Sequence, residues 1–424
     1  MRTGARRKKC IVCDAQFVGD VVHVGAQYPS AIYPKVEEDY KSLIQRSSLN
    51  LTKCTNNSCG LVQLANEYNL DFVLEHYPYL SGGTATMKGI LSDITKEVED
   101  IATLSKDDVV LDIGGNDGTL LSLLSGNVRH RINMDAAHGV ESVLDDPGYR
   151  RVQGKFSSKA YLELDILSPK VIFCVAMFYH LDNPLAFCKE VREIMNDDTI
   201  WCVQMTYLGS MLESNIYDNI VHEHVAYYSL KSLEYLMNKA GLEICDAKVV
   251  KSYGGSIRAY VMKESRKFPK QYFHKNYKSM ERYESEEKTN SVEALEKFDE
   301  RIDLLKGFTR ELIMHIIDRN GKMVAFGAST KGNMILQFTG INHNHIKCVL
   351  DNNENKIGTI MTGSEVPIID EREYLNELPE YLFVLPYYYV EFFKTFIKKY
   401  LKAGQEIYMI VPLPKPHFIK LYGS

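Results

Sequence analysis

The sequence lacks several features that would reveal its location or partners. It has no run of about 18 apolar residues, which excludes a membrane-spanning helix. The short basic stretch at residues 6–9 is not followed by an apolar signal core, because Asp14 and Asp20 interrupt it. The net charge of only −5 gives no sign of a nucleic-acid groove or a membrane-binding surface. We therefore expect a cytoplasmic protein whose partners include neither nucleic acids nor membranes.

The number of cysteines argues against a secreted disulfide framework. The chain has nine cysteines, an odd number, in 424 residues. Four of them form two pairs, Cys10 with Cys13 and Cys54 with Cys59. Two thiolate pairs separated by a loop are typical of a structural zinc site, which would stabilise a segment with little core of its own. The alternatives are four unrelated reduced cysteines or, with less support, a redox role for the first pair.

Residues 109–124 form the stretch around which the chain is organised. A β-branched apolar run leads through Gly114, Gly115 and Gly118 into an apolar helical pattern. This order of strand, tight turn and helix predicts the first unit of a doubly wound α/β domain. Gly114 would let the backbone turn sharply and a ligand approach closely, and Gly118 would let the helix pack against the strand.

The acids around this turn indicate which ligand it binds. The turn reads GGNDG and lacks the Gly-x-Gly-x-x-Gly spacing of dinucleotide sites. Asp112 ends the strand just before the glycines, and Asp135 follows about 20 residues later, where a carboxylate can bind ribose hydroxyls. We therefore predict that Asp112, Gly114, Asn116, Gly118 and Asp135 bind S-adenosylmethionine. A nicotinamide site and an unoccupied Rossmann-like layer are the alternatives.

The densest cluster of polar residues follows the later strands of this domain. Residues 171–175 and 199–203 are predicted strands, and His180 lies in the loop after the first of them. The stretch 217–228 then contains Tyr217, His222, Glu223 and His224. A metal site, a structural network and an acid–base group are all compatible with it, although the HExH spacing does not match HExxH. Its position after the 199–203 strand favours the acid–base group.

Two further glycine turns carry groups that suit a charged or hydroxylated substrate. Residues 251–258 combine a glycine pair with Ser256 and Arg258. Residues 322–424 start a second α/β unit, in which Lys331 follows a glycine turn and could neutralise a phosphate. This unit could equally serve only as a wall. Between the two units, residues 264–317 predict a connecting helix with one buried face, so we expect a monomer or a weak dimer.

These motifs, in this order, resemble the sugar C-methyltransferases that act on nucleotide-linked deoxysugars. The matching stretches are residues 10–13, 59–63, 111–121, 217–224, 254–258, 327–333 and 351–358. The resemblance implies a class I methyltransferase sheet flanked by a small N-terminal zinc-binding domain and a C-terminal Rossmann-like α/β domain. The implied boundaries are 1–75 for the zinc-binding domain, 76–263 for the methyltransferase domain, 264–318 for a helical connector and 319–424 for the C-terminal domain.

The resemblance also implies an activity and a set of roles. It implies methyl transfer from S-adenosylmethionine to a nucleotide-linked keto-deoxysugar through a base-generated enolate. His224 matches the catalytic base, with Glu223 beside it, and His180 and Tyr79 match residues near the reacting sugar. Tyr217, His222, Ser256, Arg258 and Lys331 are the expected substrate-binding residues.

Three departures from the family pattern are present. Val221 replaces a tyrosine, Tyr253 replaces a histidine, and the Cys54–Cys59 pair has two extra residues between its members. An NAD-dependent nucleotide-sugar dehydrogenase and a non-catalytic binding protein are the rival functions. Both would use the same fold, but Asp112 argues against the first and the intact HEH cluster against the second.

Overall fold

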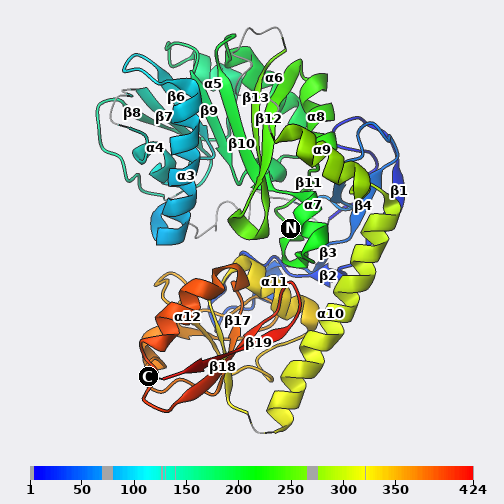
Figure 1. The fold of residues 1–424 in the computed structure, drawn as a ribbon, viewed down its shortest axis with the longest axis vertical. Helices are drawn as coiled ribbons and strands as arrows, with labels where there is room; N and C mark the ends of the chain where they lie inside the picture. The colour runs from blue at the N-terminus through cyan, green and yellow to red at the C-terminus, as the bar shows by residue number, and fades with distance from the viewer. Residues whose placement is uncertain are drawn as a thin grey trace.

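The computed structural model describes residues 4–68, 80–125, 128, 130–138, 140–264, 276–319 and 321–423. Two α/β domains lie one above the other, and the long helix α10 (Val292–Asp318) runs along one side and joins them (Figure 1). The N-terminal strands lie beside both domains. Within the described stretches, no helix combines the length and apolarity that a bilayer crossing requires.

The upper domain contains a seven-stranded sheet in the order β12-β13-β10-β9-β6-β7-β8. Its neighbours pair in parallel except where β13 meets β10 and β12. The strands are β6 (Val109–Ile113), β7 (His130–Asp135), β8 (Tyr149–Gln153), β9 (Val171–Val175), β10 (Ile200–Thr206), β12 (Leu242–Val250) and β13 (Ser256–Lys263). The predicted doubly wound methyltransferase sheet is therefore confirmed.

Helices cover both faces of this sheet because its central strands are apolar on both sides. On one face, Val110 and Phe173 share a core with Ile94 of α3. On the other face, Leu111 and Trp201 belong to a separate core with α6 and α8. The helices are α3 (Ala85–Ala102), α4 (Thr119–Ser122), α5 (Ser158–Leu162), α6 (Pro184–Ile194) and α8 (Leu230–Lys239). The helix predicted after the glycine turn is thus only four residues long.

The lower domain has a six-stranded sheet in the order β16-β15-β14-β17-β18-β19, which is parallel except for β19. Its strands are β14 (Met323–Phe326), β15 (Val349–Asp351), β16 (Ile368–Asp370), β17 (Tyr381–Val384), β18 (Glu406–Val411) and β19 (His417–Tyr422). The strand order reverses between β14 and β17, as in a Rossmann-like sheet. Helix α11 (Thr330–Thr339) faces the upper domain, and α12 (Val390–Lys398) packs against the opposite side.

The N-terminal segment is attached to both domains. Its sheet, in the order β1-β4-β5-β11, takes its last strand from the upper domain. The strands are β1 (Phe17–Val22), β4 (Leu51–Cys54), β5 (Val62–Leu64) and β11 (Ala226–Tyr227). Residues between β1 and β4 instead contact the lower domain, where Asn333 Nδ2 donates to Ser30 O at 3.1 Å and the Ile360 amide donates to Pro34 O at 2.9 Å.

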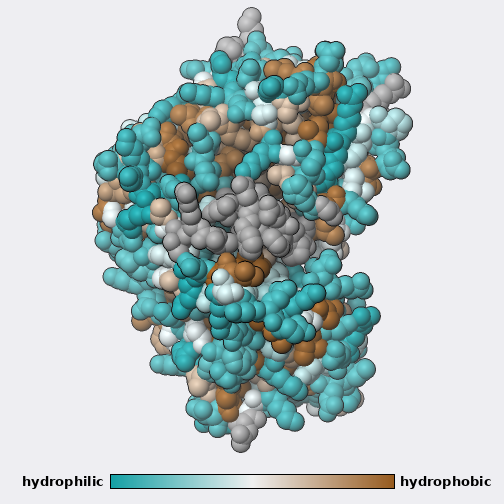
Figure 2. Space-filling view, turned by 180° about the vertical axis from the view of Figure 1, so that it is seen from behind, coloured by the Kyte–Doolittle hydropathy of each residue, from teal (hydrophilic) through white to brown (hydrophobic). Residues whose placement is uncertain are grey.

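In its described part, residues 276–318, the connector has two helices rather than one. Helix α9 (Tyr277–Glu286) packs against α8 and β12 of the upper domain, and α10 follows it. The buried residues of α10 recur every three or four positions and include Thr309, which lies in the buried stripe rather than outside it. Seen from behind the view of Figure 1, the surface of the molecule is mostly hydrophilic, with scattered hydrophobic patches on both domains (Figure 2).

Candidate active site

The glycine turn follows β6, at the point in the upper sheet where the strand order reverses and a crevice forms between the connections to β9 and β7. Gly114 has a φ of +75°, and a Cβ there would lie only 2.8 Å from Met177 Cγ, just beyond β9. Gly118 has a φ of +80°, and its Cβ would meet the Tyr149 hydroxyl at 3.0 Å. Neither position can hold a larger residue without strain. In open α/β sheets, this crevice is the usual ligand site.

Three carboxyl groups surround this turn. Asp112 is buried, and burial together with the charges of Asp135 and Asp117 raises its pKa to about 8. Asp135 accepts hydrogen bonds from the backbone amides of Asn116 at 2.8 Å and Ala137 at 2.6 Å. The structure thus brings the predicted donor-binding residues Asp112, Asn116 and Asp135 together around one turn.

A short 3₁₀ helix, η1 (Ser81–Gly83), closes one side of this acidic turn. The Ser81 amide donates to Asn116 Oδ1 at 2.9 Å, and the Gly82 amide donates to Asp117 Oδ2 at 2.7 Å. Asn116 and Asp117 therefore hold η1, which leads into α3, beside the turn. Tyr79, the predicted active-site tyrosine just before η1, lies outside the described residues.

His224 is held by a backbone carbonyl that sequence analysis did not single out. Its Nδ1 lies 2.7 Å from the carbonyl oxygen of Asn219, in the 3₁₀ helix η3 (Tyr217–Asn219). A carbonyl oxygen can only accept a hydrogen bond, so Nδ1 carries the proton and Nε2 carries the lone pair. The Tyr227 hydroxyl donates to the same carbonyl at 3.3 Å.

The structure places His180 beside His224. His180 ends the 3₁₀ helix η2 (Phe178–His180) after β9, and its ring stacks on that of His224 with centroids 5.5 Å apart. Burial lowers the pKa of His180 to about 3. Burial, followed by the positive charges of His180 and Lys331, also holds the pKa of His224 well below its usual value. Both imidazoles are therefore neutral at neutral pH.

The other two residues of the HEH motif lie near the N-terminal segment. His222 is buried with its ring edge-on to Tyr68 at 4.7 Å, and burial lowers its pKa to about 3. Burial raises the pKa of Glu223 to about 7, and the Glu223 charge in turn helps to raise the pKa of Tyr227. Glu223 thus lies near the Tyr227 hydroxyl, which donates to the same Asn219 carbonyl as His224 Nδ1.

The C-terminal domain contributes polar groups to the same region. Lys331, in the first turn of α11, lies 5.5 Å from the Tyr253 ring and 5.2 Å from the Tyr388 ring. Burial lowers its pKa, and the Asp218 carboxylate raises it. Tyr387 donates a hydrogen bond to Asp218 Oδ1 at 3.2 Å. Burial raises the pKa of Asp218 to about 6.

Several buried polar atoms between these groups have no hydrogen-bond partner among the described residues. They are the Tyr217 hydroxyl, Asp218 Oδ2, both side-chain amide atoms of Asn219 and Glu223 Oε2. An unsatisfied buried polar group costs about 1–3 kcal/mol, so folded proteins leave few of them. Their concentration in seven consecutive residues indicates a place where a polar ligand or water completes the hydrogen bonding.

The structure does not bring Arg258 and Ser256 into this cluster. The Arg258 guanidinium donates to Gln204 Oε1 and Asp93 Oδ2, each at 2.7 Å, and also contacts Glu97. Ser256 donates to the Ser252 carbonyl at 3.0 Å. Both side chains therefore form their hydrogen bonds within the upper domain. The glycine pair next to these residues predicted contact with the substrate, but Arg258 lies on β13, where its side chain faces the carboxylates of α3.

Two of the three departures from the family pattern, Val221 and Tyr253, have different environments. The Val221 side chain, only 1% exposed, lies in an apolar core, and its backbone carbonyl accepts from the His224 amide at 3.1 Å. Tyr253 has a φ of +53° and donates from its hydroxyl to Met87 Sδ at 2.7 Å. Its ring lies beside Lys331, at the edge of the polar cluster.

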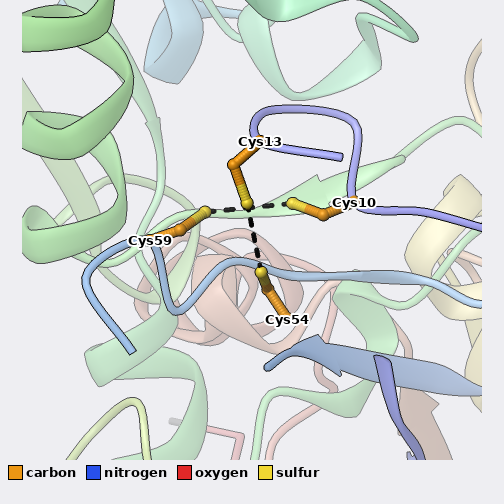
Figure 3. Close-up of side chains that lie close together, drawn as sticks. All are labelled: Cys10, Cys13, Cys54 and Cys59. Atoms are coloured by element: carbon orange, nitrogen blue, oxygen red, sulfur yellow. Dashed lines mark hydrogen bonds between the residues drawn. The ribbon is translucent and has the colours of Figure 1, made fainter. Parts of the chain in front are cut away.

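The four predicted metal ligands converge in the N-terminal domain (Figure 3). Their sulfur atoms all lie within 4.8 Å of one another, with Cys10 to Cys59 at 3.8 Å and Cys13 to Cys54 at 3.4 Å. Four sulfurs at the usual zinc distance of about 2.3 Å would be about 3.8 Å apart. The donor set and its spacing therefore fit a tetrahedral zinc ion.

The comparisons with known proteins agree with both α/β domains. Residues 86–247 match the model of a methyltransferase domain, and residues 251–414 match that of a C-methyltransferase C-terminal domain. The C-methyltransferase NovU of Streptomyces niveus is 25% identical over 417 residues, which cover 97% of this chain and 96% of NovU. The resemblance to C-methyltransferases is thus confirmed.

Solved methyltransferase structures are also similar to part of the chain. One is a chain of the complex between the Haloferax volcanii Trm112 methyltransferase activator and a putative methyltransferase, at 12% identity, with 42% of this chain and 95% of that chain covered and a TM-score of 0.34. Another is CalO1, a methyltransferase in calicheamicin biosynthesis, at 17% identity. The match covers 42% of this chain and 55% of the CalO1 chain, with a TM-score of 0.31.

The environment of Arg258 predicts a structural rather than a substrate-binding role. The substitution Arg258→Met should lower the free energy of unfolding by about 2 kcal/mol, because the variant loses charge-assisted hydrogen bonds in a buried setting. The KM for the acceptor substrate should not change. Chemical denaturation and steady-state kinetics would measure both, with the exposed Arg372→Met as control. A large rise in KM at unchanged stability would contradict this role.

Proposed function

Because this chain is a C-methyltransferase that depends on S-adenosylmethionine, we propose that it methylates a carbon atom of a nucleotide-linked keto-deoxysugar. The observation that carries the proposal is the geometry of His224. Its Nδ1 proton is committed to the Asn219 carbonyl, which leaves Nε2 as a proton acceptor in a cluster of unsatisfied polar groups. Such a group suits the removal of a proton from carbon.

A keto group makes this proton removal feasible. The hydrogen on the carbon next to a carbonyl is acidic because the negative charge left behind spreads onto the oxygen. In the proposed reaction, His224 Nε2 takes this proton, and the sugar carbon becomes a nucleophile. His180 and Tyr79 would stabilise the enolate oxygen or relay the proton. S-adenosylmethionine supplies an electrophilic methyl group, and the chain must hold the two carbons about 3–3.5 Å apart.

The substrate itself would make His224 a stronger base. The pKa of its imidazole is held low by burial and by the positive charges of His180 and Lys331. A diphosphate and a developing enolate both bring negative charge into the site, which favours the protonated imidazole. The base would therefore reach a suitable pKa only when the correct anionic substrate is bound.

Lys331 is the group that we assign to the nucleotide phosphates. It lies in the first turn of α11, where backbone amides also favour an anion. Lys331 forms no salt bridge with any residue in the described ranges, so its charge is available to a ligand. Tyr217 and His222 would complete the acceptor site from the upper domain. With these contacts, the sugar would lie between the two domains, next to His224.

The methyl donor would occupy the acidic turn. Asp112, close to the end of β6, would face the positive part of the donor, and Asp135 its ribose hydroxyls. Gly114, Asn116 and Gly118 form the turn that lets the donor approach the backbone. The zinc ion would have no part in the reaction and would hold the N-terminal sheet against the core of α8.

The substitution His224→Ala should reduce turnover by about 10²–10⁴-fold, because it removes the general base. Donor binding, measured by calorimetry, should be unchanged. The assay would incubate the enzyme with S-adenosylmethionine and a panel of nucleotide-linked ketosugars and detect a mass gain of one methyl group. His417→Ala, at an exposed position in β19, is the matched control. Near-full turnover by the His224 variant, or binding of NAD in place of the donor, would reject the proposal.

Donor binding should become tighter as the pH rises from 6 to 7.5. The pKa of Asp112 is raised to about 8, so in this range the free protein carries a proton there that a cationic ligand displaces. The affinity should then rise by about tenfold per pH unit, with release of a proton. Calorimetry in buffers of different ionisation enthalpy would measure both quantities.

The control for this pH dependence is a matched pair of variants. Asp112→Asn cannot release a proton, so its donor affinity should be weaker and flat over the same range. Asp145→Asn, on an exposed loop, should keep the wild-type slope. A wild-type affinity that does not change with pH would show that Asp112 does not face the charged part of the donor.

The purified protein should contain one zinc ion per chain. Cys59→Ser removes one of four ligands, so we expect loss of the metal and a lower melting temperature. Cys348→Ser, which changes an equally buried cysteine of the C-terminal domain, should retain the zinc. Metal analysis by mass spectrometry and thermal melting would compare the variants. Metal-free wild-type protein, purified without chelators, would contradict the zinc assignment.

A further inference from the structure

The geometry points to Tyr387 as a positioning residue for the base, supplied by the C-terminal domain. Tyr387 lies in the 3₁₀ helix η7 (Tyr387–Tyr389), directly after β17, and donates to Asp218 Oδ1 at 3.2 Å. Asp218 is fully buried and Tyr387 only 8% exposed, so this hydrogen bond crosses between the domains away from water. This inference rests on the proposed role of His224 as the base.

The hydrogen bond from Tyr387 to Asp218 is connected to His224 through the short stretch of backbone between Asp218 and the Asn219 carbonyl. Asp218 is followed by Asn219, whose carbonyl accepts the Nδ1 proton of His224 at 2.7 Å. The orientation of that carbonyl therefore depends on how η3 is held. The Asn219 side chain has no partner among the described residues that could hold it. The Asp218 side chain accepts from Tyr387 and lies near the Lys331 charge, so it attaches η3 to the C-terminal domain through polar contacts.

Apolar packing supports the same attachment. The Tyr217 ring lies 4.7 Å from the ring of Phe338 on α11, so η3 touches the C-terminal domain on both sides of Asp218. Ile220 is completely buried in the core shared with that domain. Both contacts limit the movement of η3 but do not choose the direction of a carbonyl. A hydrogen bond is directional, so it can do so.

The position of Tyr387 is itself tightly determined. Pro386 lies so close to Gly327 that a Cβ on that glycine would be 2.4 Å from the proline ring. On the other side, a Cβ on Gly254 would lie 3.7 Å from the Tyr387 hydroxyl. The second distance is an ordinary van der Waals contact, so Gly254 packs beside the hydroxyl, whereas Gly327 leaves the space that Pro386 needs just before this tyrosine.

The substitution Tyr387→Phe tests this inference because it removes one hydroxyl and keeps the ring. In protein labelled with ¹⁵N-histidine, the His224 Nδ1 proton should exchange with water about fivefold faster, the factor that one hydrogen bond is worth. The value of kcat should fall by a similar factor with little change in KM. His224→Gln identifies the resonance. Tyr400→Phe, the same change at an exposed position two residues after α12, is the control.

A pair of Asp218 variants separates positioning from general loosening. Asp218→Asn retains an oxygen that can accept from Tyr387, so the exchange rate of the His224 Nδ1 proton should stay close to that of the wild type. Asp218→Ala removes the acceptor and should match Tyr387→Phe. The double variant Tyr387→Phe/Asp218→Ala should be no worse than Asp218→Ala alone, because both changes break one interaction.

The outcomes distinguish this inference from the proposed function. If the His224 Nδ1 proton exchanges faster in Tyr387→Phe but kcat is unchanged, Tyr387 positions His224 and His224 is not the base. The exchange measurement can decide this because it needs no substrate. Unchanged exchange and kcat in Tyr387→Phe would overturn the inference. Additive losses in the double variant would also overturn it, because Tyr387 and Asp218 would then act separately.

Discussion

The architecture depends on the burial of residues 216–221 in a core to which all parts of the chain contribute. Ile216, Ile220 and Val221 pack with apolar residues of the N-terminal sheet, of α10 and of the C-terminal domain. Removing these side chains from water stabilises the fold only when all the contributing segments are present, because no single segment covers them. The segment that precedes the HEH motif is therefore placed by tertiary packing and not by local structure.

This shared core also explains why two similar sheets meet as they do. Lys331 follows β14, and Tyr387 follows β17, so both come from the carboxyl edge of the C-terminal sheet. They approach Asp218 and Tyr253, which lie beyond β10 and β12 of the upper sheet. The two crevices in which α/β sheets usually bind ligands thus open toward each other. A substrate held between them can contact both domains at once.

Local patterns in the sequence were sufficient for most of the fold. The predicted strand at 171–175 is β9 with those same bounds, and the one predicted at 199–203 is β10, which begins one residue later and ends three residues later. The helix after the GGNDG turn was overestimated because its apolar residues continue beyond Ser122 as buried non-helical chain. Single-segment periodicity cannot distinguish a buried helix from buried irregular chain.

Contacts between distant segments could not be predicted in this way. Residues 1–75 were assigned to one zinc-binding domain, but Ser30 and Pro34 bind the C-terminal domain, about 300 residues away along the chain. The boundaries of the domains remain predictions. The carbonyl of Asn219 carries no side-chain signal, and Tyr387 lies in a tyrosine run without a motif. The spacing of the four cysteines, by contrast, was enough to group them, because a metal site requires a fixed set of residue types.

The titratable groups of the site lie in two halves. Asp112, Asp117 and Asp135 surround the glycine turn, whereas His180, His224 and Lys331 lie around the polar cluster together with the carboxyl groups of Asp218 and Glu223. Without ligands, burial opposes charge in both halves: it raises the pKa of Asp112 and lowers that of His224. An ion of the opposite charge would favour the ionised form of each of these two groups. The proposed function therefore pairs a cationic methyl donor with the first half and an anionic acceptor with the second, so that the methyl group and the carbon that receives it would meet between them.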